Sequence, residues 1–146
     1  MRPTVITATR LLTAAATAGT GYVHASLYIN DGYRAIPTIG PAFLLLSSGS
    51  FAVAVLLLAG SSPVLRLGAA GVAIGALGGF IMSRTIGVAG FTERGLQPAP
   101  QALISLITEL GALALLMSLE VMLRRSPAPG QAAPSWLSVK TRPGPL

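Results

Sequence analysis

The chain has 146 residues, of which 52% are apolar and only 10% are charged, and its mean hydropathy is +0.71. Soluble domains carry about 25% charged residues, so this composition excludes a soluble monomer and a chain that is disordered over most of its length. The sequence has no cysteine and one histidine, which excludes disulfides, zinc–thiolate sites, iron–sulfur clusters and metal sites that need two imidazoles.

Four apolar segments are long enough to cross a bilayer as helices, for which about 20 residues are needed. We expect these helices at residues 11–31, 41–59, 64–83 and 101–123. The sequence therefore predicts an all-α integral membrane four-helix bundle that runs up-down-up-down within residues 1–125. A segment such as 11–31 could also be read as a cleavable signal peptide, but its apolar run continues past the small residues of a cleavage site, which favours a retained helix.

The last part of the chain, residues 126–146, differs in composition from the rest. It contains Pro127, Pro129, Pro134, Pro143 and Pro145. Because proline interrupts helices, we expect a Pro-rich extended or disordered tail on the cytoplasmic side.

Basic residues are unevenly divided between the two sides that four spans would create. One side carries Arg2, Arg10, Arg66, Arg124, Arg125, Lys140 and Arg142, and the other carries Arg34, Arg84 and Arg94. Cytoplasmic loops carry the excess of Lys and Arg, so seven against three predicts that both termini are cytoplasmic in a multi-pass plasma-membrane protein. The net charge of +6 does not indicate nucleic-acid binding, because these residues stand at the ends of apolar runs.

Small residues are expected to hold the helices together, because lipid is as apolar as leucine and burial alone drives no association. Gly71, Gly75 and Gly79 repeat at every fourth position and form one smooth helix face. We expect this face to pack against the small residues of segment 11–31, Gly19 and Gly21 among them. A seam between two copies of the chain is the alternative.

Ionisable residues inside membrane helices are costly and suggest a function. Glu109 shares a small, polar helix face with Ser105 and Ala112 and is expected to point into the bundle, with Arg84 as a plausible partner. Glu120 lies four residues before Arg124 and is interpreted as a structural ion pair. Glu109 is either a structural carboxyl or a site for a proton or a ligand.

His24 is the second candidate. Thr17, Gly21, His24, Tyr28 and Asp31 fall on one helical stripe, so His24 is expected to face protein rather than lipid. It is either a hydrogen-bonded histidine that fixes its helix or a residue that binds a proton or a ligand. The candidate polar site comprises His24, Tyr28, Asp31, Arg34, Arg84 and Glu109, capped on the outer side by the polar residues of the two longer loops.

The residues around this site carry a recognisable pattern. The stretches HASLY at 24–28 and YRAIPTIGPAFLL at 33–45 resemble a group of small actinobacterial four-helix membrane proteins that share H-x-x-L-Y and Y-R-x-I-P-x-I-G-x-x-F-L-L. The layout is also similar to that of DoxX-like four-helix proteins. The resemblance implies a bacterial plasma-membrane protein of unassigned activity and brings no catalytic residues with it.

Three functions are compatible with these features. The first is an accessory or interaction subunit of a larger membrane complex, whose partners would be the lipid bilayer and other membrane subunits. The second is a small carrier or ligand-binding protein that uses His24 and Glu109, which requires a cavity open to the outer side. The third is a membrane oxidoreductase component that contacts quinone or haem. The sequence predicts no catalytic residue, metal site or cofactor.

Overall fold

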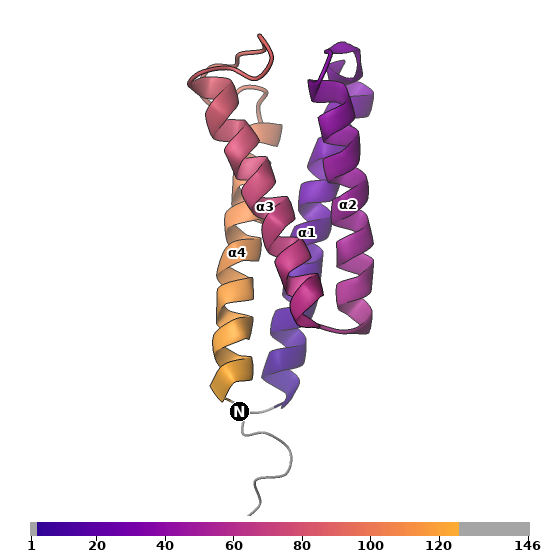
Figure 1. Cartoon of the computed structure of the whole chain (residues 1–146), viewed down its shortest axis with the longest axis vertical. Helices are drawn as coiled ribbons and strands as arrows, with labels where there is room; N and C mark the ends of the chain where they lie inside the picture. Colours follow the sequence, from indigo (N-terminus) through magenta and orange to yellow (C-terminus); the bar gives the residue numbers. More distant parts are fainter. Residues whose placement is uncertain (1–2, 126–146) are drawn as a thin grey trace, which may run out of the picture.

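A computed structural model of the chain describes residues 3–125, and the expected Pro-rich tail lies outside the described residues. The described chain consists of α1 (Pro3–Asn30), a 3₁₀ turn η1 (Tyr33–Ala35), α2 (Ile39–Ala59), α3 (Pro63–Arg84) and α4 (Gln101–Arg125). The prediction of an all-helical chain with four long helices is therefore confirmed. Figure 1 shows the four helices side by side in an elongated bundle.

The helix ends differ from the expected apolar segments where capping chemistry decides them. α1 begins at Pro3 rather than near residue 11, because a helix can continue beyond its apolar part. α3 begins directly after Ser62, whose hydroxyl accepts a hydrogen bond from the Leu65 N–H, and Pro63 occupies the first turn. α2 starts at Ile39, so the expected first residue, Pro41, lies inside the first turn, where it removes no helical hydrogen bond.

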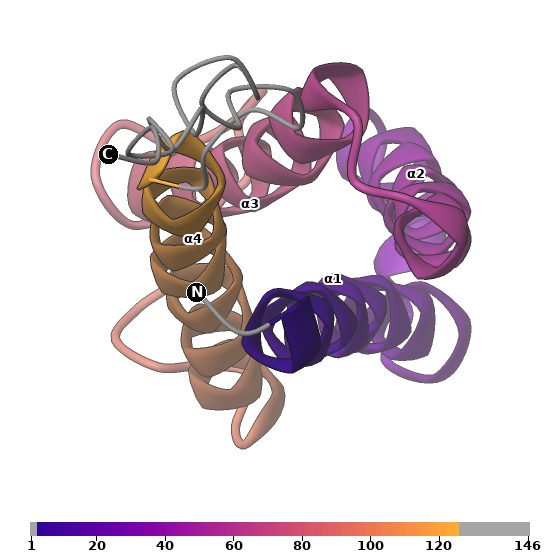
Figure 2. The same cartoon turned by 90° about the horizontal axis from the view of Figure 1, so that it is seen from below.

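The four helices form a ring in which α1 lies between α2 and α4, and α3 closes the ring on the opposite side (Figure 2). We call the end that carries residues 31–38 and 85–100 the loop end. The other end, where α1 begins and α4 finishes and where α2 connects to α3, is the tail end (Figure 1). The loop end closes over a cavity, and the tail end carries Arg66, Arg124 and Arg125.

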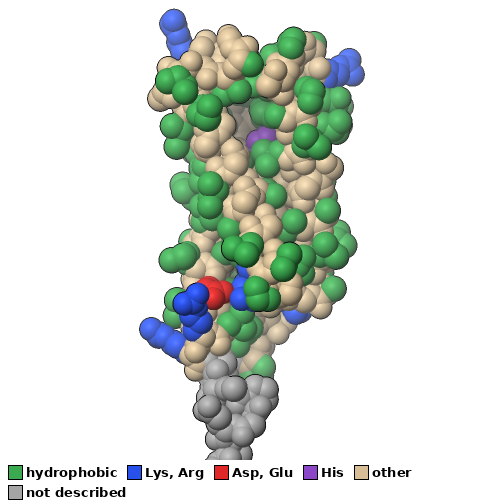
Figure 3. Space-filling model, in the orientation of Figure 1, with side chains coloured by type: hydrophobic (Ala, Val, Ile, Leu, Met, Phe, Trp, Pro, Cys, Tyr) green, Lys and Arg blue, Asp and Glu red, His purple; other side chains and the backbone are tan. Residues whose placement is uncertain are grey.

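The distribution of side chains is the reverse of that in a soluble protein. The interior is rich in small and hydroxyl-bearing residues, whereas large apolar side chains are exposed on all four helices. Figure 3 shows such side chains over one face of the bundle. The exposed apolar side chains include Leu12, Leu45, Leu67 and Ile107, each more than half exposed. An apolar surface of this extent marks contact with lipid or another protein.

α1 contributes most of the interior polarity. Three of its buried threonines, Thr9, Thr13 and Thr17, each donate their hydroxyl to the backbone carbonyl four residues earlier, with O···O distances of 2.8–2.9 Å. These bonds satisfy the hydroxyls within the helix, so they can be buried without a partner on another helix.

Three helices, α2, α3 and α4, are long and apolar enough to cross a membrane, whereas four spans were expected. α1 is the helix that falls short of this hydropathy, although it has 28 residues. Its mean hydropathy is lower because its inward faces carry threonine, alanine and glycine, whereas α2 and α4 carry more leucine.

The glycines show which faces approach closely. A Cβ added to Gly19 would lie 2.8 Å from the Thr108 side chain on α4, and one added to Gly21 would lie 3.0 Å from Ser50 Cβ on α2. The small residues of α1 therefore seat it between two neighbours. The expectation that Gly71, Gly75 and Gly79 pack inside the bundle is wrong. All three are exposed, and a Cβ at any of them would meet nothing within 4 Å.

The reason for this difference is the rotation of α3 about its axis. Its buried residues are Ala69, Ala73, Ala76 and Ser83, so alanines rather than glycines supply its packing face. A seam between two chains along the glycines stays a prediction.

This packing leads to a test with a matched control. Gly21→Leu should lower the free energy of unfolding by about 1–3 kcal/mol, because the added side chain must displace Ser50 and the α2 backbone. Gly71→Leu adds the same side chain where space is open and should leave the unfolding of the monomer nearly unchanged. Thermal unfolding in detergent measures both, and equal effects would contradict the assigned packing faces.

Candidate ligand-binding cavity

A cavity of about 150 Å³ lies inside the bundle near the loop end. All four helices and the 85–100 loop contribute to its wall. Its helical lining includes His24 and Leu27 from α1, Ala42, Phe43 and Leu46 from α2, Ala76, Gly79 and Ser83 from α3, and Ala102 and Ser105 from α4. The wall is mainly apolar and carries a few polar groups, the pattern typical of small-molecule sites.

His24 is the polar group on the α1 side of the cavity, and it is only 6% exposed. Its Nδ1 lies 2.9 Å from the Thr20 carbonyl oxygen one turn earlier. A carbonyl can only accept, so Nδ1 carries the proton, and in the neutral ring Nε2 is left as an acceptor. The ring also meets Phe43 of α2 edge to face, with centroids 4.9 Å apart. His24 therefore faces protein, as the helical stripe predicts.

A linked group of side chains forms the roof of the cavity. Tyr33 stacks on Phe43 with ring centroids 5.1 Å apart, and its hydroxyl donates to Glu93 Oε1. Glu93 Oε2 in turn pairs with Arg84 Nη1 at 2.9 Å. The roof thus connects residues 31–38 with residues 85–100, and the Tyr33 and Phe91 rings meet at 5.8 Å where the two loops touch.

Arg84, at the last turn of α3, anchors this roof. Its Nε donates to the Gly95 carbonyl at 2.6 Å and its Nη2 to the Gln97 carbonyl, so one guanidinium spans the 85–100 loop. The same group lies 3.6 Å from the centroid of the Phe80 ring, a cation–π contact. The planar guanidinium has five N–H donors, which suits a residue that must hold several carbonyls at once.

The expectation that Arg84 pairs with Glu109 is wrong, because Arg84 instead pairs with Glu93. Glu109 is 1% exposed and accepts a hydrogen bond from Ser105 on Oε1, while its Oε2 has no hydrogen-bond partner within residues 3–125. Since Ser105 lines the cavity and Glu109 does not, the carboxyl stands directly behind the cavity wall. Its inward face is small and polar as predicted, with Ser105 and Ala112 also buried.

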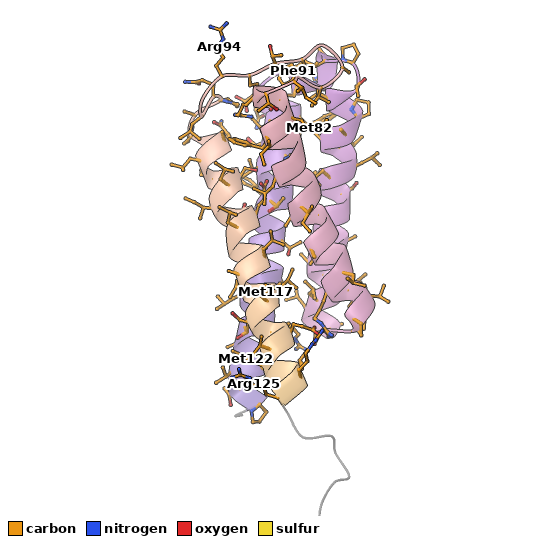
Figure 4. The ribbon with its side chains drawn as sticks, turned by 60° about the vertical axis from the view of Figure 1, so that its left-hand side comes forward. Met82, Phe91, Arg94, Met117, Met122 and Arg125 are labelled. Carbon is orange, nitrogen blue, oxygen red and sulfur yellow. The ribbon has the colours of Figure 1, made fainter. Side chains whose placement is uncertain are left out.

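The remaining members of the expected site lie elsewhere. Asp31 and Arg34 are exposed and Tyr28 is half-buried, and none of the three lines the cavity. α1 ends at Asn30 and Gly32 adopts a left-handed conformation with φ +79°, so the chain turns away before the stripe can continue inward. Arg94, expected in the polar cap, points away from the bundle, whereas Phe91 lies in the loop above the end of α3 (Figure 4).

Sequence reasoning missed the aromatic part of the cavity. Phe43, Phe80 and Phe91 line it, and the Tyr33 ring packs against Phe43 and Phe91. No periodic pattern marks the loop residues, because their positions depend on the contacts of Arg84 rather than on a helix or strand repeat.

The tail end carries a second polar cluster. Glu120 accepts from Arg124 Nε at 2.8 Å, which confirms the expected i,i+4 pair, and from Arg66 Nε of α3 at 3.0 Å. The glutamate therefore ties α3 to α4 where these helices reach the tail end.

Burial and the neighbouring Glu93 carboxylate raise the pKa of Tyr33 above its ordinary value near 10. Above about pH 10 the tyrosine of the unfolded chain loses its proton before the folded one does, so the stabilising contribution of Tyr33 declines as the pH rises. The melting temperature should therefore fall more steeply between pH 9 and pH 11 in the wild-type chain than in Tyr33→Phe. Parallel curves would contradict the roof contact.

Within residues 3–125, no group of three or more His, Asp or Glu side chains is arranged to hold a metal ion. Comparison with known proteins finds no matching protein-family model, curated protein or solved structure. The chemistry of the cavity is therefore argued from its own geometry.

Proposed function

We propose that this chain is a multi-pass membrane protein that binds a small, largely apolar ligand in the loop-end cavity. The observation that carries the proposal is the cavity itself. His24, Ser83 and Ser105 stand in a mainly apolar wall, and its charged lining residues, Arg84 and Glu93, are paired with each other in the roof. Few polar groups in an apolar pocket fix the orientation of a ligand, whereas a filled bundle core would serve packing alone.

The proposed membrane arrangement has all four helices across the bilayer, up-down-up-down, with both termini in the cytoplasm of a bacterial cell. α1 lies alongside two helices that are apolar enough to span, and its polar residues face those neighbours, so it can cross with them. Arg66, Arg124 and Arg125 gather at the tail end, which supports a cytoplasmic position for that end.

Cysteine labelling tests this topology without background, because the chain has no cysteine. An impermeant thiol reagent should label Leu96→Cys, in the exposed 85–100 loop, from outside intact cells. Gly60→Cys, in the turn between α2 and α3, should react only after the membrane is opened. The reverse pattern would contradict the orientation, and labelling of both from outside would show that α3 does not cross the membrane between them.

Ligand binding is tested with the full chain purified from its own membranes in mild detergent. Mass spectrometry of the extracted small molecules should reveal a species present with the wild-type chain and absent with Ala76→Phe, whose larger side chain would fill the cavity. The new ring has the cavity to occupy, so the variant should still fold, and its thermal unfolding checks this. Identical extracts from two folded proteins would refute a ligand-binding function.

An accessory subunit is the second candidate function. The observation that favours it is the exposed face of Gly71, Gly75 and Gly79, which is smooth enough for the helix of another membrane protein. Under this function, Gly75→Leu would release the chain from a larger complex on a native gel while Ala76→Phe would not. The two functions therefore respond to substitutions at different positions on α3: Gly75 is exposed and does not line the cavity, whereas Ala76 is buried and lines it.

A further inference from the structure

The mouth of the cavity lies between two helices rather than at the end of the bundle. Of the residues that line the cavity, only Ala42 and Gly79 are exposed, and they belong to α2 and α3. Figure 3 shows a hollow between these helices near the loop end, with histidine visible inside it, and His24 is the only histidine of the chain. Both mouth residues are small, so the opening is not blocked by a side chain.

Entry from water at the loop end is blocked by the roof, whereas the mouth between α2 and α3 is open. The roof consists of Tyr33, Glu93 and Arg84, joined by hydrogen bonds and an ion pair, and the Arg84 and Glu93 side chains are only 12% and 14% exposed. A ligand that entered through the roof would have to separate the Arg84–Glu93 pair. A ligand that entered between α2 and α3 would break no hydrogen bond or ion pair among the described residues.

The mouth also has a defined depth. Gly79 stands five residues before the end of α3, and Ala42 three residues after the start of α2. At a rise of 1.5 Å per residue, the mouth lies roughly 5–8 Å below the helix ends. In a bilayer this depth is that of the first carbons beneath the headgroups, where amphiphiles with a ring and a polar group collect.

The size and chemistry of the interior narrow the class of ligand. A cavity of about 150 Å³ accommodates one benzene-sized ring. Phe43, Phe80 and Phe91 supply aromatic walls for such a ring. His24 lines the cavity, and its Nδ1 is bound to the Thr20 carbonyl of its own helix. Nε2 lies on the other side of the imidazole and has no hydrogen-bond partner within residues 3–125.

On these grounds, and resting on the proposed ligand-binding function, we infer that the ligand is a lipid-soluble alcohol with a single ring. It enters sideways from the bilayer between α2 and α3 and donates its hydroxyl to His24 Nε2. The hydroxyl matters because Nε2 of the neutral ring can only accept, so a ligand that offers only acceptors leaves the nitrogen unpaired.

The test uses the full-length chain in lipid nanodiscs and two probes of matched shape, 4-propylphenol and 4-propyltoluene, with concentrations expressed per lipid. The wild-type chain should bind the phenol about tenfold more tightly, since one hydrogen bond to a buried nitrogen distinguishes them. The readout is the rise in melting temperature as each probe is added. This comparison uses the wild-type chain alone, so it does not depend on whether a variant of His24 folds.

Variants locate the entrance. Gly79→Leu and Ala42→Leu narrow the mouth and should abolish or strongly slow phenol binding. Gly71→Leu is the matched control, because Gly71 lies in open space on the same face of α3 about two turns before Gly79, does not line the cavity, and should bind as the wild type does. Both mouth variants place the new side chain at exposed positions and should keep the fold.

The outcomes separate the inference from the function on which it rests. Equal binding of phenol and toluene probes would overturn the assigned hydroxyl donor and leave a ligand-binding cavity in place. Unchanged binding in both mouth variants would overturn the sideways entrance. If neither probe raised the melting temperature of the wild-type chain, this ligand class would be refuted, and the extraction experiment with Ala76→Phe would then decide whether the cavity binds anything.

Discussion

Replacement of Arg84 by methionine is expected to lower the free energy of unfolding by about 3–5 kcal/mol, the largest effect of any single change at the cavity. Arg84 and Glu93 are largely buried, so removal of the guanidinium leaves the carboxylate without its counter-ion. The Gly95 and Gln97 carbonyls lose their donors in the same step, which frees the 85–100 loop. Thermal unfolding in detergent measures the loss, and limited proteolysis within the loop reports its release.

Two further variants separate charge from shape in this prediction. Arg84→Met combined with Glu93→Gln should recover part of the stability, because no unpaired charge remains buried. Arg84→Lys should be intermediate, because an ammonium keeps the charge but cannot reach several carbonyls in one plane. If the double variant unfolds as readily as Arg84→Met alone, the ion pair with Glu93 does not hold the roof.

Gly40→Val should produce the second large loss, about 3 kcal/mol, at the upper end of the range for overpacking. A Cβ at Gly40 would lie 2.8 Å from the Arg34 carbonyl oxygen and 3.0 Å from that of Tyr33. Both atoms belong to the backbone of η1 and cannot rotate away, so the start of α2 must shift and the stacking of Tyr33 on Phe43 is disturbed.

Gly49→Val, in the middle of α2, provides the matched control for Gly40→Val. A Cβ there would meet nothing within 4 Å, so it should change stability far less. Melting temperatures of the two variants, measured side by side, test the close approach. Equal losses would indicate that valine in α2, rather than the contact with η1, is responsible.

The sequence predicted the four helices because each contains a long apolar run, but it placed the start of α1 at residue 11 although the helix begins at Pro3, since that helix extends beyond its apolar part. The inward position of His24 and Glu109 followed from the small residues that share their helix faces. Periodicity could not predict which face of α3 packs, because Ala69, Ala73 and Ala76 repeat at nearly the same spacing as the glycines.

The roof of the cavity could not be predicted for a different reason. Tyr33, Arg84 and Glu93 come from three separate parts of the chain and meet only once the bundle has formed. Glu93 stands in a loop without a repeat, so nothing in its neighbours identifies it as the partner of Arg84 rather than of the exposed Arg94. Glu109 was the wrong choice of partner because the 85–100 loop folds over the end of α3 and brings the Glu93 carboxylate within 2.9 Å of Arg84.

The central claim, that the cavity beside His24 takes a ligand from the bilayer through the mouth between α2 and α3, is tested most directly by photolabelling. A phenol that carries a propyl diazirine would be dissolved in nanodiscs that hold the full-length chain and then activated by light. Peptide mapping should place the label on cavity residues such as Leu46, Ala76 and Phe80, and an excess of 4-propylphenol should suppress it. Label spread evenly over the exposed apolar side chains of the bundle, with none in the cavity, would contradict the claim.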